Sequence, residues 1–243
     1  YASVKTSHYL IEAERRAFAD RNTYLGDPAF VKNPVARLLS PAHAAALRAT
    51  ILPDRATPSA QIKGSLGANE GQHTTHYSIV DAQGNAVAVT YTLNLFFGTG
   101  RIAGDTGFFL NNEMDDFVSK PGVPNAFGLL GDKANSVDAG KRPLCSLAPT
   151  IVFADGEPWF ATGIPGGSFI LSAVLQIIVN VIDHGRNIAA ASAVLTPCAW
   201  VSGNSPQTAP SSVCSASMPI PSRSIIASRP VKSACSLASV SSE

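Results

Sequence analysis

The sequence is poor in charged residues, and the few that it has nearly cancel. Of its 243 residues, 14% are Asp, Glu, Lys or Arg, and the formal net charge is +1. A chain that binds a polyanion such as nucleic acid carries a clear basic excess, so nothing here indicates such a partner. The hydrophobic content of 45% favours a compact folded enzyme over a disordered chain.

Long apolar runs and paired cysteines are also lacking. The most apolar stretch, residues 169–182, contains Gln176 and Asn180. It is too short and too polar to cross a bilayer alone, so it predicts a buried helix. The cysteines show no C-x-x-C pair and no metal-ligand spacing, so we expect neither zinc nor another metal. They are Cys145, Cys198, Cys214 and Cys235.

The first third of the chain predicts two helices and a linker. Residues 4–19 have apolar side chains at helical spacing, and Glu12 and Arg16 form an i,i+4 pair that we expect on a solvated face. Turn signals follow at residues 20–22. A second helix is expected over residues 41–50, and the unpatterned residues 53–72 predict an exposed linker. The apolar face of the first helix would hold Tyr9, Leu10, Ala13, Ala17 and Phe18.

The middle of the chain predicts two β-hairpins. The first joins residues 75–81 to 86–93, which would place Thr92 and Asn94 back beside Thr74. The second joins residues 146–153 to 157–163 around Asp155-Gly156, a strong turn signal. Antiparallel strands with packed helices predict an α+β layered sandwich.

Two adjacent threonines, Thr74 and Thr75, stand where a segment rich in Gly, Asn and Gln gives way to a strand. A threonine hydroxyl is a weak nucleophile unless a base activates it. A cut before Thr74 would create an α-amine that could serve as that base, because its pKa is about 8 and part of it is neutral near pH 7. Paired threonines at a strand start are also ordinary β-formers, so local chemistry leaves both interpretations open.

Longer motifs carry a resemblance to a known family. They are TTHYSIVDAQGNAVAVTYTLNLFFGTG, FLNNEMDDF, KPGVPNAFG, KRPLCSLAPTIV and TGIPGGS. Together they make residues 7–193 resemble the γ-glutamyltranspeptidase family. The resemblance implies the four-layer αββα sandwich of the N-terminal-nucleophile hydrolases, incomplete in this chain. Residues 1–73 would be the C-terminal part of the large-subunit region with its linker, and residues 74–193 the small-subunit catalytic core.

The resemblance implies a role for each of several residues. Thr74 would be the nucleophile, both for self-cleavage of the His73–Thr74 bond and for attack on a γ-glutamyl amide. Thr92 would support its hydroxyl, and the amides of Gly166 and Gly167 would form the oxyanion hole.

The resemblance also implies which residues bind the glutamyl group. Asn94, Glu113 and Asp116 would hold its α-amino group, and Cys145 and Ser146 its α-carboxylate. The family often has paired serines at the latter positions, so Cys145 is a departure, and a thiol is a weaker donor than a hydroxyl.

Other interpretations of the same residues remain. Without the resemblance, residues 111–116 would be a solvated acidic turn, and they lack the spacing of a calcium loop. His73 and His76 more simply flank the cut than form a metal or Ser-His site. Residues 121–131 resemble the lid loop of the family. The family's carboxylate-binding arginine belongs to a segment upstream of residue 1, so no arginine here is assigned that role.

The implied function is γ-glutamyl transfer and hydrolysis, through a threonine acyl-enzyme, of glutathione and other γ-glutamyl amides. Acceptors would be amino acids, peptides or water, and no metal or organic cofactor is implied. Large and small subunits would come from one precursor, located in the periplasm or outside the cell by resemblance alone. The alternatives are a related acylase, such as a cephalosporin acylase, and an inactive truncated fragment.

The chain changes character near residue 194. Residues 194–243 are rich in Ser and Pro and contain a single acidic residue, Glu243. The resemblance stops there, and the chain begins at Tyr1 without a signal-like segment, so we expect a fragment. We expect the last segment to be disordered, either as a natural tail or as the product of translation out of frame.

Overall fold

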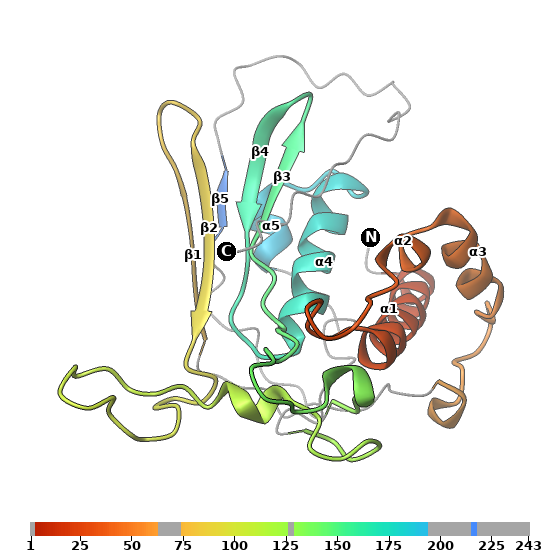
Figure 1. The fold of residues 1–243 in the computed structure, drawn as a ribbon. Coiled ribbons are helices and arrows are strands. Elements are labelled where there is room, and N and C mark those ends of the chain that lie inside the picture. Colours follow the sequence, from red (N-terminus) through yellow and green to blue (C-terminus); the bar gives the residue numbers. More distant parts are fainter. Residues whose placement is uncertain (1–2, 63–73, 126–128, 194–214, 218–243) are drawn as a thin grey trace.

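The computed structural model describes residues 3–62, 74–125 and 129–193, and the backbone of residues 215–217. Its helices and strands form an α+β fold, which confirms the predicted fold class at that level (Figure 1). The helices are α1 (Val4–Tyr24), α2 (Val35–Leu38), α3 (Pro41–Ala49), α4 (Phe169–Ile182) and α5 (Ile188–Ala193). The strands are β1 (Thr74–Val80), β2 (Ala86–Thr92), β3 (Thr150–Ala154), β4 (Glu157–Thr162) and β5 (Ser215–Ser217).

Helix α1 is longer than its sequence predicted. It begins after Ser3, whose side chain accepts the N–H of Thr6 as an N-cap. The turn predicted at residues 20–22 is wrong, because the helix continues through them to Tyr24. Tertiary contacts hold this last turn: Asn22 is buried, and its carbonyl accepts the N–H of Asp132 at 3.1 Å.

The charged residues of α1 were expected in solvent, and this prediction is wrong. Glu12 is 1% exposed and Arg16 is 6% exposed. The Glu12 carboxylate accepts from Arg15 at 2.7 Å, from Arg16 at 2.6 Å and from the Thr57 hydroxyl at 2.6 Å. The segment that follows α3 therefore lies across this face of the helix, and Arg16 also donates to the Thr50 hydroxyl at 2.7 Å.

The Glu12 carboxylate stays charged in this buried position. Burial by itself raises the pKa of Glu12, but hydrogen bonds from Thr57 and Arg16 outweigh it and lower the pKa to about 2. The i,i+4 spacing of Glu12 and Arg16 is the same on a solvated and on a buried face. Spacing alone could not show that another segment covers the pair.

Both predicted hairpins are present, but the strand predicted from residue 146 begins only at Thr150. Strands β1 and β2 pair antiparallel with Thr74 opposite Thr92, and the Asp81 carboxylate accepts the N–H groups of the turn at Gln83 and Asn85. Strands β3 and β4 pair around Asp155 and Gly156, whose φ angles of 53° and 87° suit a two-residue hairpin turn. The predicted helix over residues 41–50 is α3, one residue shorter.

Helix α4 has the bounds expected of the apolar stretch and carries the main core. Ile170 and Ile177 are fully buried in two neighbouring clusters, and that of Ile177 includes Val152 and Phe160 of the β3–β4 pair. In Figure 1 the β1–β2 hairpin lies on one side of β3 and β4, α4 lies on the other side, and α1 lies beyond α4. Strand β5 pairs with β4 and completes a three-stranded sheet.

Parts of the predicted organisation lie outside the described residues. The predicted exposed linker is confirmed for residues 53–56, which are exposed, but it is wrong for Thr57, which binds Glu12, and for Ile62, which is buried; residues 63–73 are not described. The His73–Thr74 cut and the division into 1–73 and 74–193 therefore stay predictions. Of the segment from residue 194 onward, only the backbone of β5 is described, so the expected disorder also stays a prediction. None of the helices in the described ranges has the length and apolarity that a membrane crossing requires.

Candidate active site

One pocket gathers most of the residues that the sequence singled out. It lies between the lower end of the β1–β2 hairpin, the 113–116 turn, the 145–147 segment and the start of α4. Gly166 adjoins this lining, and His73 lies outside the described residues. The lining consists of Thr74, Thr92, Asn94, Glu113, Asp116, Cys145, Ser146, Leu147, Gly167, Ser168 and Ile170. The structure thus brings these side chains together from four separate segments, while their roles stay predictions.

Thr74 and Thr92 face each other across the hairpin. They are direct partners in the β-ladder, and the Thr74 hydroxyl donates to the Thr92 hydroxyl oxygen at 3.2 Å. The same Thr92 oxygen accepts the backbone N–H of Asn94 at 2.9 Å. Thr75 pairs with Tyr91 and is exposed on the other face of the strand. Only Thr74 of the two adjacent threonines therefore lines the pocket.

Asn94, two residues after strand β2, has a backbone conformation that few residues adopt. Its φ is +76°, in the left-handed region where asparagine is among the better tolerated non-glycine residues. The side chain is buried and donates to the Asn112 carbonyl at 3.2 Å and to the Asp116 carboxylate at 3.4 Å. This bend turns the chain away from the strand and fixes Asn94 against the acidic turn.

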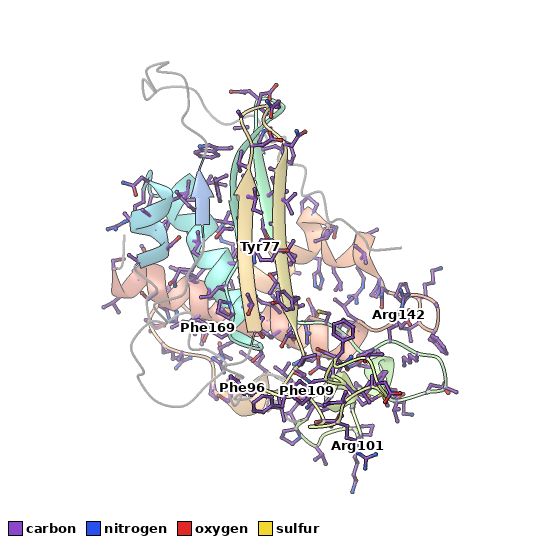
Figure 2. The ribbon with its side chains drawn as sticks, turned by 90° about the vertical axis from the view of Figure 1, so that its left-hand side faces the viewer. Tyr77, Phe96, Arg101, Phe109, Arg142 and Phe169 are labelled. Carbon is purple, nitrogen blue, oxygen red and sulfur yellow. The ribbon has the colours of Figure 1, made fainter. Side chains whose placement is uncertain are left out.

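Beyond Asn94 the chain enters an apolar loop before it returns to the acidic turn. The rings of Phe97 and Phe109 contact each other within this loop, with centroids 5.3 Å apart and planes tilted by 52°. Figure 2 shows Phe96 and Phe109 below the lower end of the hairpin, with Arg101 farther out. The loop closes where the Asn112 N–H donates to the Leu93 carbonyl at 3.1 Å.

Glu113 and Asp116 are two carboxylates held close together in a partly buried 3₁₀ turn. Burial raises the pKa of Glu113 to about 7, and the charge of Asp116 adds to this effect. Burial also raises the pKa of Asp116, against hydrogen bonds from Glu113 and Asn94. The pair therefore retains a proton toward neutral pH, and a cation in the pocket would favour its release.

Arg21 of α1 contacts the 145–146 segment of the pocket wall from behind, on the side away from Thr74. Its guanidinium donates to the Ser146 hydroxyl at 3.0 Å and to the Cys145 carbonyl at 3.1 Å. Sequence reasoning missed this residue because it placed Arg21 in a turn. The available signal was helical spacing, since Arg21 and Asn22 follow the core residue Phe18 at i+3 and i+4.

Cys145 is present as a thiol rather than a thiolate. Cys145 is exposed at the mouth of the pocket, but the surrounding wall still desolvates its sulfur and raises the pKa of the thiol, and the nearby charges of Glu113 and Asp116 act in the same direction. Its sulfur accepts the N–H of Leu147 at 3.3 Å. Ser146 therefore offers the stronger hydrogen-bond donor of the two residues.

Gly166 and Gly167 form the turn that leads into α4, and the conformation of this turn requires glycine. Their φ angles are +136° and +57°, which side chains rarely adopt. A Cβ added at Gly166 would also meet the Phe169 ring at 3.0 Å. Their carbonyls accept the N–H groups of Phe169 and Ile170, which fixes the turn to the first residues of the helix.

Contacts join the two sides of the predicted cut. Besides Arg21, Asp27 binds Arg142 through two side-chain hydrogen bonds of 2.8 Å and 3.1 Å. Within residues 3–62, 74–125 and 129–193, we find no group of three His, Cys, Asp or Glu residues that could hold a metal ion. His76, which the sequence left beside the cut, is buried and interacts with the hydroxyls of Thr90 and Ser78 at 2.7 Å and 2.9 Å.

The comparisons with known proteins identify one family and several similar proteins. The model of the gamma-glutamyltranspeptidase family matches residues 1–200. A glutathione hydrolase proenzyme of Escherichia coli is 53% identical over 193 residues, which cover 79% of this chain and 33% of the relative. An acylase ACY 1 proenzyme of a Pseudomonas species (strain V22) is 38% identical over 203 residues, which cover 84% and 34%.

Among solved structures, a cephalosporin acylase from Bacillus halodurans matches with a TM-score of 0.59 and 24% identity. The match covers 76% of this chain and 31% of that one, and it shows a shared fold only. The chain spans about a third of the length of the curated relatives it matches.

Proposed function

Because this chain belongs to the γ-glutamyltranspeptidase family, we propose that the protein containing it cuts itself before Thr74 and then transfers or hydrolyses γ-glutamyl groups. Its donors are glutathione and other γ-glutamyl amides. The observation that carries the proposal is the Thr74–Thr92 hydrogen bond. Both threonines line the pocket that Asn94 and Asp116 also line. The E. coli relative is named glutathione hydrolase proenzyme, which supports both the proposed activity and the proposed cleavage of a precursor.

The same hydroxyl performs two reactions. In the precursor, Thr74 Oγ1 attacks the His73 carbonyl carbon, the peptide nitrogen leaves as the new α-amine of Thr74, and water hydrolyses the ester. In the mature enzyme, Thr74 Oγ1 attacks the γ-carbonyl of a donor while that amine takes the hydroxyl proton. The proton then passes to the leaving amine, and water or an acceptor amine releases the γ-glutamyl group from the Thr74 ester.

The two ends of the pocket suit the two charges of a glutamyl group. Glu113 and Asp116 form charge-assisted hydrogen bonds with the α-ammonium, and the Asn94 carboxamide adds a neutral contact. Ser146, with Cys145 beside it, receives the α-carboxylate. These contacts place the γ-carbonyl at Thr74, near the Gly166-Gly167 turn, whose amides stabilise the tetrahedral oxyanion by about 3 kcal/mol per donor.

The remaining parts of the proposal concern the whole protein. The β1–β2 hairpin and the β3–β4–β5 sheet would be parts of the two β layers of an αββα sandwich, with α4 and α5 in one helical layer. Residues before Thr74 would belong to the large subunit and those after it to the small subunit. Acceptors would be amino acids, peptides or water, in the periplasm or outside the cell.

The second candidate function is an acylase, which the similarity to the acylase ACY 1 proenzyme favours. A glutaryl amide is the γ-glutamyl amide without its α-ammonium group, so an enzyme selective for it gains nothing from two partly buried carboxylates. The Glu113–Asp116 pair therefore favours the γ-glutamyl donor.

A direct comparison of two substrates tests this choice. The full-length protein is incubated with γ-glutamyl-p-nitroanilide and with glutaryl-p-nitroanilide, and kcat/KM is compared, with Thr74→Ala as the control for background release. We expect the γ-glutamyl anilide to be strongly preferred, and Asp116→Asn to reduce that preference. A preference for the glutaryl anilide would favour the acylase. The 243-residue chain alone should show little activity, because it spans only a third of its relatives.

A further inference from the structure

Arg21 is a charged side chain that none of the assigned roles uses. It lies in the last turn of α1, partly buried, and its guanidinium contacts three partners. One terminal nitrogen donates to the Asn22 side-chain oxygen at 3.0 Å, and the other donates to the Cys145 carbonyl and the Ser146 hydroxyl. The guanidinium is therefore held in place by its own helix and by the pocket wall together.

The contact with Ser146 fixes the direction of a proton. A guanidinium has donors only, so the Ser146 oxygen is the acceptor of the 3.0 Å hydrogen bond from Arg21. The single hydroxyl proton of Ser146 must then point away from Arg21. Ser146 lines both the small cavity that Arg21 borders and the pocket that holds Thr74. The Ser146 hydroxyl can therefore donate its proton into the pocket that holds Thr74.

The charge of Arg21 also balances the acidic side of the pocket. Asp116 lines both cavities and interacts electrostatically with Arg21. The titratable groups that interact with Arg21 are Asp116 and Cys145, and Glu113 in turn lies against both of these. Arg21 itself is not among the residues that line the pocket of Thr74, so its contact with that pocket runs through Cys145 and Ser146.

We propose that Arg21 is a positioning residue that aims the hydroxyl proton of Ser146 at the α-carboxylate of the γ-glutamyl donor. This inference rests on the proposed function and extends it, since Arg21 precedes the predicted cut and Ser146 follows it. The large-subunit region thereby determines carboxylate recognition by a residue of the small subunit, without touching the substrate.

The test uses the full-length protein with Arg21→Met, Arg21→Lys and Ser146→Ala. With γ-glutamyl-p-nitroanilide, Arg21→Met should raise KM by roughly tenfold, as expected for one lost hydrogen bond, while kcat changes little. The Ki of L-glutamate should rise in parallel, while the Ki of 4-aminobutyrate, which lacks the α-carboxylate, stays the same. Arg21→Lys keeps the charge and one donor and should lie between Arg21→Met and the unchanged protein.

Two comparisons separate positioning from a general structural effect. If Arg21 acts through Ser146, the double variant Arg21→Met/Ser146→Ala should have the KM of Ser146→Ala alone. Arg142→Met breaks another arginine contact between residues before and after the cut, its bond to Asp27, and should leave KM unchanged.

An unchanged KM in Arg21→Met, or additive effects of the two substitutions, would overturn the inference while leaving the proposed function intact. If Arg21→Met yields no folded protein, Arg21→Lys decides by the same criteria. Absence of anilide release by the unsubstituted protein would instead contradict the proposed function, and this inference with it.

Discussion

Helices α1 and α4 both end or begin at the pocket wall, but they are packed by opposite kinds of side chain. Helix α4 buries an apolar face that includes Ile170 and Ile177. Helix α1 buries Glu12, Arg15 and Arg16, which bind one another and the segment after α3. Any well-packed apolar neighbour stabilises a buried apolar face, whereas a buried charge is stable only with hydrogen-bonding partners of the right kind and geometry. The two helices should therefore respond differently to substitution.

The largest effect is expected where one partner of the buried charge network is removed. Glu12→Ala leaves Arg15 and Arg16 buried without their carboxylate, which should destabilise the full-length protein by about 3–5 kcal/mol. Urea unfolding followed by circular dichroism measures the change. Lys5→Ala, an exposed substitution on the same helix, should change the unfolding free energy by less than about 0.5 kcal/mol. Equal effects of the two substitutions would show that the network contributes nothing.

Truncation on the apolar helix should cost somewhat less. Ile177 is fully buried in the core. Ile177→Ala therefore leaves a cavity and should destabilise the protein by about 2–4 kcal/mol. Ile177→Val should cost only about 1 kcal/mol, because most of the side chain remains. Leu175 on the same helix is 40% exposed, and Leu175→Ala is the matched control. A larger loss from Leu175→Ala than from Ile177→Ala would mean that the apolar face of α4 is assigned wrongly.

Glu14 provides a pH-dependent comparison, because it is a buried acidic residue of α1 that lies against Ser172 of α4. Burial raises the pKa of Glu14 to about 8, an effect that Ser172 only partly offsets. The folded protein thus binds a proton that the unfolded chain releases near pH 4.5. The free energy of unfolding should fall as pH rises from 5 to 8, by at most about 1.4 kcal/mol per pH unit.

Glu14→Gln removes this titration, so its unfolding free energy should fall less steeply over the same range. Urea midpoints at pH 5.5, 6.5 and 7.5 give the two slopes. Identical slopes would show that the Glu14 carboxyl titrates normally in the folded protein.

The smallest effect concerns the acidic turn that faces Arg21, the last charged residue of α1. Because the pKa of Glu113 is raised to about 7, the Glu113–Asp116 pair carries one negative charge fewer below that pH. KM for a γ-glutamyl anilide should therefore increase about fivefold between pH 8 and pH 6, as a charge-assisted hydrogen bond weakens. Glu113→Gln should have a raised KM at pH 8 and a flatter profile. Glu157→Gln, an exposed substitution in β4, should keep the original profile.

The same contrast explains what the sequence could predict. The bounds of α4 and both hairpins follow from local patterns, since an uninterrupted apolar stretch and an Asp-Gly turn need no knowledge of distant residues. The burial of Glu12 depends on Thr57, which lies 45 residues away in sequence. No periodicity encodes such a partner, so the charged face of α1 was assigned to solvent.

The site divides in a similar way. The proximity of Thr74 and Thr92 was predictable from the hairpin register, and the structure confirms that they are opposite each other. The left-handed conformation of Asn94 and the contact between Arg21 and Ser146 were not, because each depends on a segment remote in sequence. The run of Asp20, Arg21 and Asn22 is typical of a turn, so the role of Arg21 was not predicted. Tertiary contacts keep these residues helical instead.

The most direct test of the account is the identity of the residue at the new N-terminus of the self-cleaved protein. The full-length protein and its Thr74→Ala, Thr74→Ser and Thr75→Ala variants are purified, and the smaller fragment is sequenced from its N-terminus. Thr74→Ser keeps a hydroxyl beside Thr92 and should retain some cleavage. Thr75 is exposed on the opposite face of β1, so Thr75→Ala should be cleaved normally.

The account predicts a fragment that begins at residue 74 in the unsubstituted protein and no cleavage in Thr74→Ala. A fragment beginning at residue 74 in Thr74→Ala, or loss of cleavage in Thr75→Ala alone, would contradict it.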